Sequence, residues 1–390
     1  MTTAQIHYPL ASSSWDEAEL NAIQKVIATG NYTMGQHVAQ FEKDFALKFD
    51  SRYAVMVNSG SSANLLAIAA LFYKKEKPLH RGDEVIVPSL SWSTTFFPVS
   101  QYGLKLVFVD IDLSTLNIDV TQLEAALSEK TRAVFVPNIL GNPADLVKIK
   151  QFCDAHDLYL IEDNCESMGA TINNKQAGTF GICGTFSTFF SHHIATMEGG
   201  VIATDDIEFY HLLLSLRSHG WTRHLPEKNE LCIKSPNPFY ESFRFILPGY
   251  NFRPVEMSGA VGVEQLKKLD GFIAARRENA QHFQKLFSNS KFILQQENGK
   301  SSWFGFSFIL KNGSIVERDN YVKQLQHANI AVRPIVTGNF LKNEALKWLD
   351  YRIVGEHKNS QQADQCGFFV GNHHYPIFSE LNHLAEVLSI

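Results

Sequence analysis

Short β-rich segments alternate with helical segments through the first half of this 390-residue chain, and this alternation limits the fold more than any other feature. Seven segments predict strands: 54–57, 84–87, 105–109, 133–137, 159–162, 185–189 and 200–203. Apolar residues at helical spacing lie between several of them, at 63–72, 120–127 and 145–156. Such alternation is typical of a parallel sheet covered by helices on both faces. We therefore predict an α/β fold with a mostly parallel seven-stranded sheet.

A smaller α+β domain is predicted beyond the sheet. A helical pattern covers 257–287, and strands are predicted near 303–310 and 332–335. We place the large domain at 28–260, and the small domain at 261–390 together with 1–27. Within 1–27, Ser14 and Glu17 have the spacing of a capping box, which predicts a helix that begins at Ser14.

Composition excludes several classes of protein. The net charge of −5 provides no basic surface for nucleic acid. Residues 1–10 lack the pattern of a signal peptide, and no apolar stretch approaches the roughly 20 residues that span a bilayer. The five cysteines are odd in number and never have CxxC spacing, which argues against a zinc ribbon or a disulfide framework. We expect a cytoplasmic protein that binds neither nucleic acid nor a membrane.

A turn of small residues follows the first predicted strand and opens a helix. Residues 58–64 read Asn-Ser-Gly-Ser-Ser-Ala-Asn, with Gly60 and Ser61 at the centre. Small residues let backbone N–H groups approach a phosphate, and a helix N-terminus favours its negative charge. A serine-capped turn without a ligand has the same pattern, so both interpretations stay open. No GK[ST] follows, so the turn is not a Walker A loop.

Three further features are ambiguous when each is taken alone. Trp92 is by default a core aromatic residue. Asp163 ends an apolar strand, where it could cap a helix or bind a ribose. The pair His192-His193, with Glu198 nearby, could lie in a polar loop or bind a metal, although metal sites more often use other spacings. The order of these features along the chain is that of fold-type I enzymes, which depend on pyridoxal phosphate (PLP).

With these residues the chain resembles the DegT/DnrJ/EryC1/StrS family of PLP-dependent nucleotide-sugar enzymes over nearly its whole length. The segments that carry the resemblance are 8–13, 91–95, 162–170, 191–200, 219–223 and 333–340. The resemblance implies the fold of a fold-type I PLP-dependent transferase, similar to aspartate aminotransferase. The aminotransferases of the family have a lysine at the position of His192, and that lysine binds PLP covalently. An imidazole cannot form this bond, so the resemblance implies non-covalent PLP and a dehydratase.

The resemblance also implies roles for individual residues. Gly60, Ser61 and Ser187 would hold the cofactor phosphate, Trp92 would stack on the ring, and Asp163 would bind the ring nitrogen. His192 would be the catalytic residue, and no metal is implied. Glu166 lies where many aminotransferases of the family have glutamine near the ring hydroxyl, and its role stays open because two acids so close would share a proton.

Four more residues are placed by the resemblance further along the chain. Asn251 would reach the cofactor phosphate of the other subunit in a homodimer with shared active sites. His219, Arg253 and Arg333 are candidates for binding the carboxylates of an amino acid or the sugar nucleotide. Each of these three could equally be a surface or ion-pair residue.

The implied activity is the C3 dehydration of GDP-4-keto-6-deoxy-D-mannose to GDP-4-keto-3,6-dideoxy-D-mannose, a step towards the dideoxysugar colitose of lipopolysaccharide O-antigens. L-Glutamate would convert PLP to pyridoxamine phosphate (PMP), and ammonia would be released. His192 would act first as base and then as acid, which suits a pKa of about 6.5. The GDP group rests on the resemblance alone, so a dehydratase that acts on a different NDP-4-keto-6-deoxy sugar also fits.

Four further classes of protein fit the sequence less well. An aminotransferase needs the attachment lysine, and no lysine lies between Lys175 and Lys228. A related dehydratase that uses an iron–sulfur cluster needs four clustered cysteines, whereas Cys232 alone lies between His192 and Lys300. A nicotinamide dehydrogenase would have GxGxxG after the first strand. A PLP fold that serves only as a binding module would not need Asp163 or the Glu198-Gly199-Gly200 segment.

Overall fold

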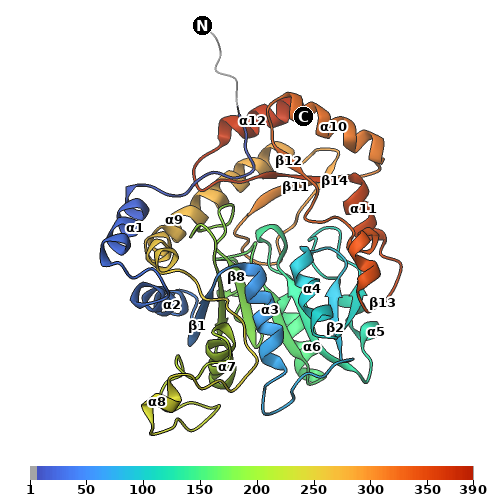
Figure 1. The fold of residues 1–390 in the computed structure, drawn as a ribbon. Helices are drawn as coiled ribbons and strands as arrows, with labels where there is room; N and C mark the ends of the chain where they lie inside the picture. Colours follow the sequence, from blue (N-terminus) through green and yellow to red (C-terminus); the bar gives the residue numbers. More distant parts are fainter. Residues whose placement is uncertain (1–6, 390) are drawn as a thin grey trace.

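A large sheet with helices on both faces lies beside a smaller sheet in the computed structural model, which describes residues 7–389 (Figure 1). The strand order in the large sheet is β1-β9-β8-β5-β4-β2-β3-β13. Their bounds in that order are Tyr53–Val57, Gly200–Thr204, Cys183–Ser187, Tyr159–Asp163, Thr131–Pro137, Glu84–Pro88, Lys105–Val109 and Tyr351–Ile353. Strand β9 is antiparallel to β1 and β8, and the other neighbours are parallel. The predicted mostly parallel sheet is confirmed, with β13 as an eighth strand that the sequence did not indicate.

The strands of the large sheet are buried on both faces. Along β3, Leu106 and Phe108 face one apolar cluster, whereas Val107 and Val109 face the other, as the alternation of side chains in a strand requires. Helices α3 (Gly60–Leu71), α4 (Ser93–Gln101) and α7 (Ile207–Arg217) contribute to the first cluster, and α5 (Leu123–Ala126) and α6 (Leu146–Ala155) to the second. The helices predicted from apolar spacing between the strands are therefore present.

The second sheet is antiparallel, with the order β10-β11-β14-β12. Its strands are Phe292–Leu294, Gly305–Leu310, Gly367–Gly371 and Val332–Arg333. It packs with α9 (Glu256–Phe287), α10 (Ile315–His327), α11 (Lys358–Cys366) and α12 (Phe378–Val387) around one apolar core (Figure 1). The remaining elements are α8 (Pro238–Glu241), the hairpin β6 (Thr171–Ile172) and β7 (Lys175–Gln176), and short 3₁₀ turns at Val120–Gln122, Ile139–Gly141, Phe340–Lys342 and Glu344–Trp348. The domain boundaries at 27/28 and 260/261 stay a prediction.

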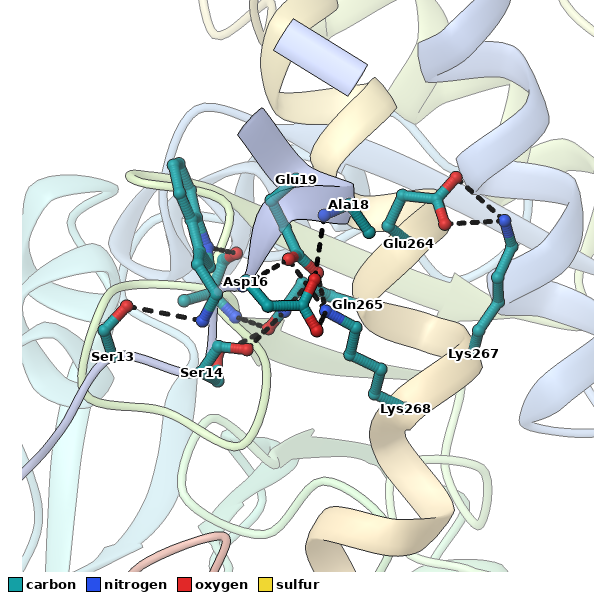
Figure 2. Close-up of polar contacts among 11 residues, drawn as sticks. Ser13, Ser14, Asp16, Ala18, Glu19, Glu264, Gln265, Lys267 and Lys268 are labelled. Carbon is teal, nitrogen blue, oxygen red and sulfur yellow. Dashed lines mark hydrogen bonds and ion pairs between the residues drawn. The ribbon is translucent and has the colours of Figure 1, made fainter. Parts of the chain in front are cut away.

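Helices α1 (Glu17–Thr29) and α2 (Gln36–Lys48) pack against α9. A capping box does begin α1, but the prediction of Ser14 as its first residue was wrong. Asp16 accepts a hydrogen bond from the backbone N–H of Ala18, and Glu19 accepts one from the N–H of Asp16, both at 2.8 Å (Figure 2). Ser14 instead donates to Gln265 of α9, so the tertiary contact moves the helix start by two residues.

No helix within residues 7–389 is long and apolar enough to cross a membrane.

The first prediction concerns Gly200, where β9 passes the turn before α3. A Cβ at Gly200 would lie 2.3 Å from the carbonyl oxygen of Ser59 and 2.7 Å from the nitrogen of Gly60. Gly200→Ala should therefore destabilise the fold by about 1–3 kcal/mol, since backbone must move. Gly271→Ala is the matched control, because Gly271 lies in α9 with no atom within 4 Å of the added Cβ and should gain about 1 kcal/mol. Denaturant unfolding of both variants measures the difference, and equal stabilities would contradict the prediction.

Candidate active site

A cavity of about 440 Å³ lies where strands of the large sheet end and the small sheet begins. Strands β4, β5 and β8 contribute their last residues, Pro137, Asp163 and Ser187, as expected for ligand sites in parallel sheets. Eight predicted site residues line this cavity: Gly60, Ser61, Trp92, Asp163, Glu166, Ser187, His192 and Arg333. A larger hollow of about 790 Å³ lies beside α7 and the loop after it, and none of the predicted site residues lines it.

The N-terminus of α3 forms one wall of the cavity. Ser59 caps the helix by accepting a hydrogen bond from the N–H of Ser62 at 3.0 Å. Gly60 has no space for a side chain, because a Cβ would lie 2.8 Å from the Cβ of Ser187 and 3.0 Å from the Sγ of Cys165. The hydroxyl of Ser61 donates to that of Thr94 at 3.1 Å. A helix N-terminus, two serine hydroxyls and a close backbone approach together form a suitable anion site.

Asp163 is held by three hydrogen bonds at the floor of the cavity. Its Oδ2 accepts from Asn64 at 2.8 Å and from Thr95 at 2.7 Å, and its Oδ1 accepts from the N–H of Cys165 at 3.2 Å. Asn64 is itself oriented by Thr185, which donates to its Oδ1 at 2.5 Å. Asp163, Asn64, Thr95 and Thr185 are all buried, so the carboxylate has one orientation. Asn64 and Thr95 were not predicted as site residues, although both lie within motifs that the sequence indicated.

Glu166 lies at the cavity wall and has one hydrogen bond, from the N–H of Leu140 at 2.9 Å. Removal from bulk water raises the pKa of Glu166 to about 7, the bond from Leu140 opposes that shift, and the charge of Asp163 adds to it. With a pKa near neutrality the carboxyl group can donate a hydrogen bond when protonated and accept one when ionised. The expectation that Glu166 and the ring hydroxyl of the cofactor would share a proton stays a prediction.

His192 lies in the loop between β8 and β9, and its ring packs near Phe189 and Phe304 at centroid distances of 6.2 and 5.4 Å. Its Nδ1 is buried without a hydrogen-bond partner among the described residues. Burial lowers the pKa of His192 to about 4; a backbone hydrogen bond with Phe189 opposes this shift, and the charge of Arg276 adds to it. The expected pKa of about 6.5 was therefore wrong. A pKa of about 4 favours the neutral imidazole at pH 7 and makes its protonated form a stronger acid than an ordinary imidazolium.

Trp92, Arg333 and Phe304 also line the cavity. Trp92 is not a core residue, since 56% of it is exposed where it lines the cavity. Arg333 on β12 is exposed and, within residues 7–389, forms no ion pair with a carboxylate. Its guanidinium remains available to an anionic ligand. Phe304 forms part of the wall next to His192, and no sequence pattern indicated it.

Three predicted residues, Asn251, Arg253 and His219, do not line the cavity of their own chain. They lie together elsewhere: the Nε of Arg253 donates to the Oδ1 of Asn251 at 3.0 Å, and the N–H of His219 donates to the carbonyl of Tyr250 at 2.6 Å. Their placement leaves any role in this chain's own cavity unsupported.

No group of three His, Cys, Asp or Glu residues in the described part of the chain could hold a metal ion. His193, one member of the suspected pair, is buried, and its Nε2 is hydrogen-bonded to the carbonyl of Ser302 at 3.2 Å.

Comparison with known proteins identifies the class to which this fold and cavity belong. The profile of the DegT/DnrJ/EryC1/StrS aminotransferase family matches residues 13–374, and the chain belongs to this family. The chain is 58% identical over 391 residues to GDP-4-keto-6-deoxy-D-mannose 3-dehydratase of Yersinia pseudotuberculosis, covering 100% of both chains.

Solved structures agree with that assignment. The chain matches E. coli GDP-4-keto-6-deoxy-D-mannose-3-dehydratase with bound hydrated PLP at a TM-score of 0.96 and 56% identity, over 99% of this chain and 100% of that one. It also matches GDP-4-keto-6-deoxymannose-3-dehydratase with a trapped PLP-glutamate geminal diamine, at a TM-score of 0.96 and 56% identity, over 98% and 100% of the two chains. The predicted family and the predicted fold of a PLP-dependent transferase are confirmed.

The protonation of Glu166 can be tested on the cofactor-free protein. Infrared spectra of wild type should contain a carboxylic acid carbonyl band that titrates away with a midpoint near pH 7, because the pKa of Glu166 is raised to about 7. Glu166→Gln should remove the part of this band that belongs to Glu166. Glu162→Gln is the control, since burial raises the pKa of Glu162 to about 7 as well, and that variant should lose a separate part of the band. A spectrum unchanged by Glu166→Gln would contradict the prediction.

Proposed function

We propose that this protein is a PLP-dependent dehydratase that removes the C3 hydroxyl of GDP-4-keto-6-deoxy-D-mannose, with L-glutamate as cosubstrate. One observation carries the proposal: His192 lines the cavity of an aminotransferase-type fold, and the resemblance to the family assigns to it the position of the lysine that binds PLP covalently. The full-length identity of 58% to a GDP-4-keto-6-deoxy-D-mannose 3-dehydratase supports the substrate. The product is GDP-4-keto-3,6-dideoxy-D-mannose.

The residues of the cavity fit PLP as a non-covalent cofactor. Gly60 and Ser61 are the first residues of α3, and Ser187 lines the cavity beside them. A helix N-terminus with serine hydroxyls suits the negative charge of the phosphate. Asp163 is a buried carboxylate of fixed orientation and suits the ring nitrogen. The exposed indole of Trp92 suits the face of the ring. When bound, PLP and its amino form supply an electron sink to the substrate attached to them.

The protein's own residues move the protons. His192 is neutral at pH 7 because its pKa is lowered to about 4, so its imidazole accepts a proton from the bound substrate and cofactor. The resulting imidazolium is a stronger acid than usual and passes that proton to the C3 oxygen, which leaves as water. Glu166 can exchange a hydrogen bond with the ring hydroxyl of the cofactor in either protonation state, since its pKa is about 7.

Arg333 is the residue of the cavity best suited to a substrate anion. Its guanidinium is exposed at the cavity wall and fits either the carboxylate of glutamate or the diphosphate of the sugar nucleotide. No other arginine or lysine among the described residues lines this cavity.

A homodimer with shared active sites belongs to the same proposal. The anion site at α3 is lined by no described arginine or lysine except Arg333 across the cavity, so a partner subunit can complete it with Asn251, Arg253 and His219. The segment 233–245 supports such an interface because its large apolar side chains are exposed: Ile233 by 91%, Phe239 by 89%, Phe243 by 71%, Tyr240 by 60% and Phe245 by 52%. We also propose a cytoplasmic location, which the five free cysteines of the described chain support.

Product analysis tests the proposed reaction. Wild type with PLP, glutamate and GDP-4-keto-6-deoxymannose should form the 3-deoxy sugar, and the CDP and dTDP analogues test the nucleotide. His192→Asn keeps a polar side chain without an acid–base function, so the rate should fall by about 10²–10⁴-fold. PLP binding, measured separately by titration, should persist because other residues hold the cofactor. Formation of a 4-amino sugar by wild type, or full dehydration by His192→Asn, would overturn the proposal.

Subunit mixing tests the shared active sites. A His192→Asn chain and an Asn251→Ala chain should each be inactive or strongly impaired alone. In a heterodimer one of the two sites would combine an intact His192 with an intact Asn251, so mixing should restore part of the activity. Labelled subunits report whether exchange takes place. Demonstrated exchange without recovered activity would contradict shared sites.

A further inference from the structure

The loop that carries His192 is bonded from outside at His193, whose Nε2 lies 3.2 Å from the carbonyl oxygen of Ser302, and at both backbone groups of Ala195. Trp15 donates from its Nε1 to the carbonyl oxygen of Ala195 at 2.8 Å. Gln265 of α9 accepts from the N–H of Ala195 through its Oε1 at 3.1 Å. Both backbone groups of Ala195 are thus bonded to side chains that come from segments distant in sequence. We call Trp15 and Gln265 the Ala195 clamp.

The clamp is itself anchored by a buried polar cluster at the start of α1 (Figure 2). Gln265 is fully buried, accepts from the Ser14 hydroxyl at 2.6 Å and donates to Glu19 at 2.7 Å. Lys268 pairs with Glu19 at 2.7 Å and with Asp16 at 2.9 Å. The buried carboxylate of Glu19 pairs with Lys268 and accepts a hydrogen bond from the Nε2 of Gln265. This bond holds the carboxamide of Gln265 with its oxygen towards Ala195.

His192 has no comparable support of its own. The Nδ1 of its imidazole has no hydrogen-bond partner among the described residues, and the position of the ring depends on the loop backbone and on packing near Phe189 and Phe304. Ala195 lies three residues further along, a distance of at most about 11 Å of extended chain. Both residues lie in a loop whose ends are joined by Thr196, whose N–H donates to the carbonyl of Thr188 at 2.8 Å.

We infer that Trp15 and Gln265 are positioning residues for the dehydration: by holding Ala195 they set where the imidazole of His192 lies relative to the reacting atoms. This inference rests on the proposed function. The N-terminal segment thereby contributes to the proton transfer without contacting the substrate.

Trp15→Phe is the direct test, since it keeps an aromatic ring and removes the one donor to Ala195. Misplacement of a catalytic group by a fraction of an ångström to an ångström lowers rates by about 10–100-fold, and kcat of the dehydration should fall within this range. KM for the GDP-sugar and the dissociation constant of PMP should not change. The kinetic isotope effect with PMP deuterated at C4′ should rise, because proton removal becomes slower than the other steps.

A second readout does not require a working enzyme. In the cofactor-free protein, hydrogen–deuterium exchange of the amides at 192–197 should become faster in Trp15→Phe. Ser14→Ala removes one donor to the Oε1 of Gln265. It should lower kcat and speed the exchange of these amides, as Trp15→Phe does, but by smaller factors. Lys267→Met is the matched control, because Lys267 lies on the same helix and pairs only with Glu264 among the described residues, at 2.7 Å (Figure 2). It should match wild type in both readouts.

The outcomes separate this inference from the proposed function. Wild-type exchange and wild-type kcat in both Trp15→Phe and Ser14→Ala would overturn the clamp. If wild type forms no 3-deoxy sugar, the proposed reaction fails, while the exchange experiment still decides whether the clamp orders the loop. If Trp15→Phe does not fold, Ser14→Ala decides both readouts. An equal loss of kcat in Lys267→Met would also overturn the inference, because the effect would then be general.

Discussion

The site depends on the contact of three backbone segments that leave no space for a side chain between them. The turn before α3 lies against the end of β8 and the start of β9, so that a Cβ on Gly60 or Gly200 would overlap the neighbouring chain. This contact brings a helix N-terminus, the hydroxyl of Ser187 and the loop that carries His192 to one edge of the sheet. The antiparallel β9 is required for it, because a parallel strand would return the chain to the opposite edge.

Burial shifts the pKa values of Glu166 and His192 in opposite directions. Among the described residues, Asp163 is surrounded by donors, Glu166 has a single one, and the Nδ1 of His192 has no partner. The pKa of Glu166 consequently rises to about 7, while that of His192 falls to about 4. A lowered pKa makes the imidazole a weaker base but its protonated form a stronger acid. The departure of hydroxide from C3 benefits most from this shift, because hydroxide is a poor leaving group unless it is protonated.

The sequence predicted what local pattern and segment order determine. The seven strands and the helices between them follow from apolar spacing. The eight site residues came from the family resemblance, and they fall in one cavity because the elements and loops that carry them meet at one edge of the sheet. The features that the sequence did not predict depend on tertiary contacts. Strand β13 is three residues long and joins the sheet through β3 alone, and the start of α1 moved because Ser14 bonds to Gln265. Phe304 reaches the cavity from the small sheet's side, and the low pKa of His192 requires the burial that this contact helps to provide.

In the proposed enzyme His192 stands in place of the attachment lysine, and this changes what the scaffold must supply. A lysine bound to PLP fixes the cofactor and its own amine at once, because one covalent bond joins them. With an imidazole both must be fixed separately: the cofactor through its phosphate, ring nitrogen and ring face, and the imidazole through its backbone. In the proposed enzyme the network around Asp163 would serve the first need, and the bonds from Trp15 and Gln265 to Ala195 would serve the second. By this reasoning the N-terminal segment and α9 support the proposed active site together with the sheet, since both bind the loop three residues after His192.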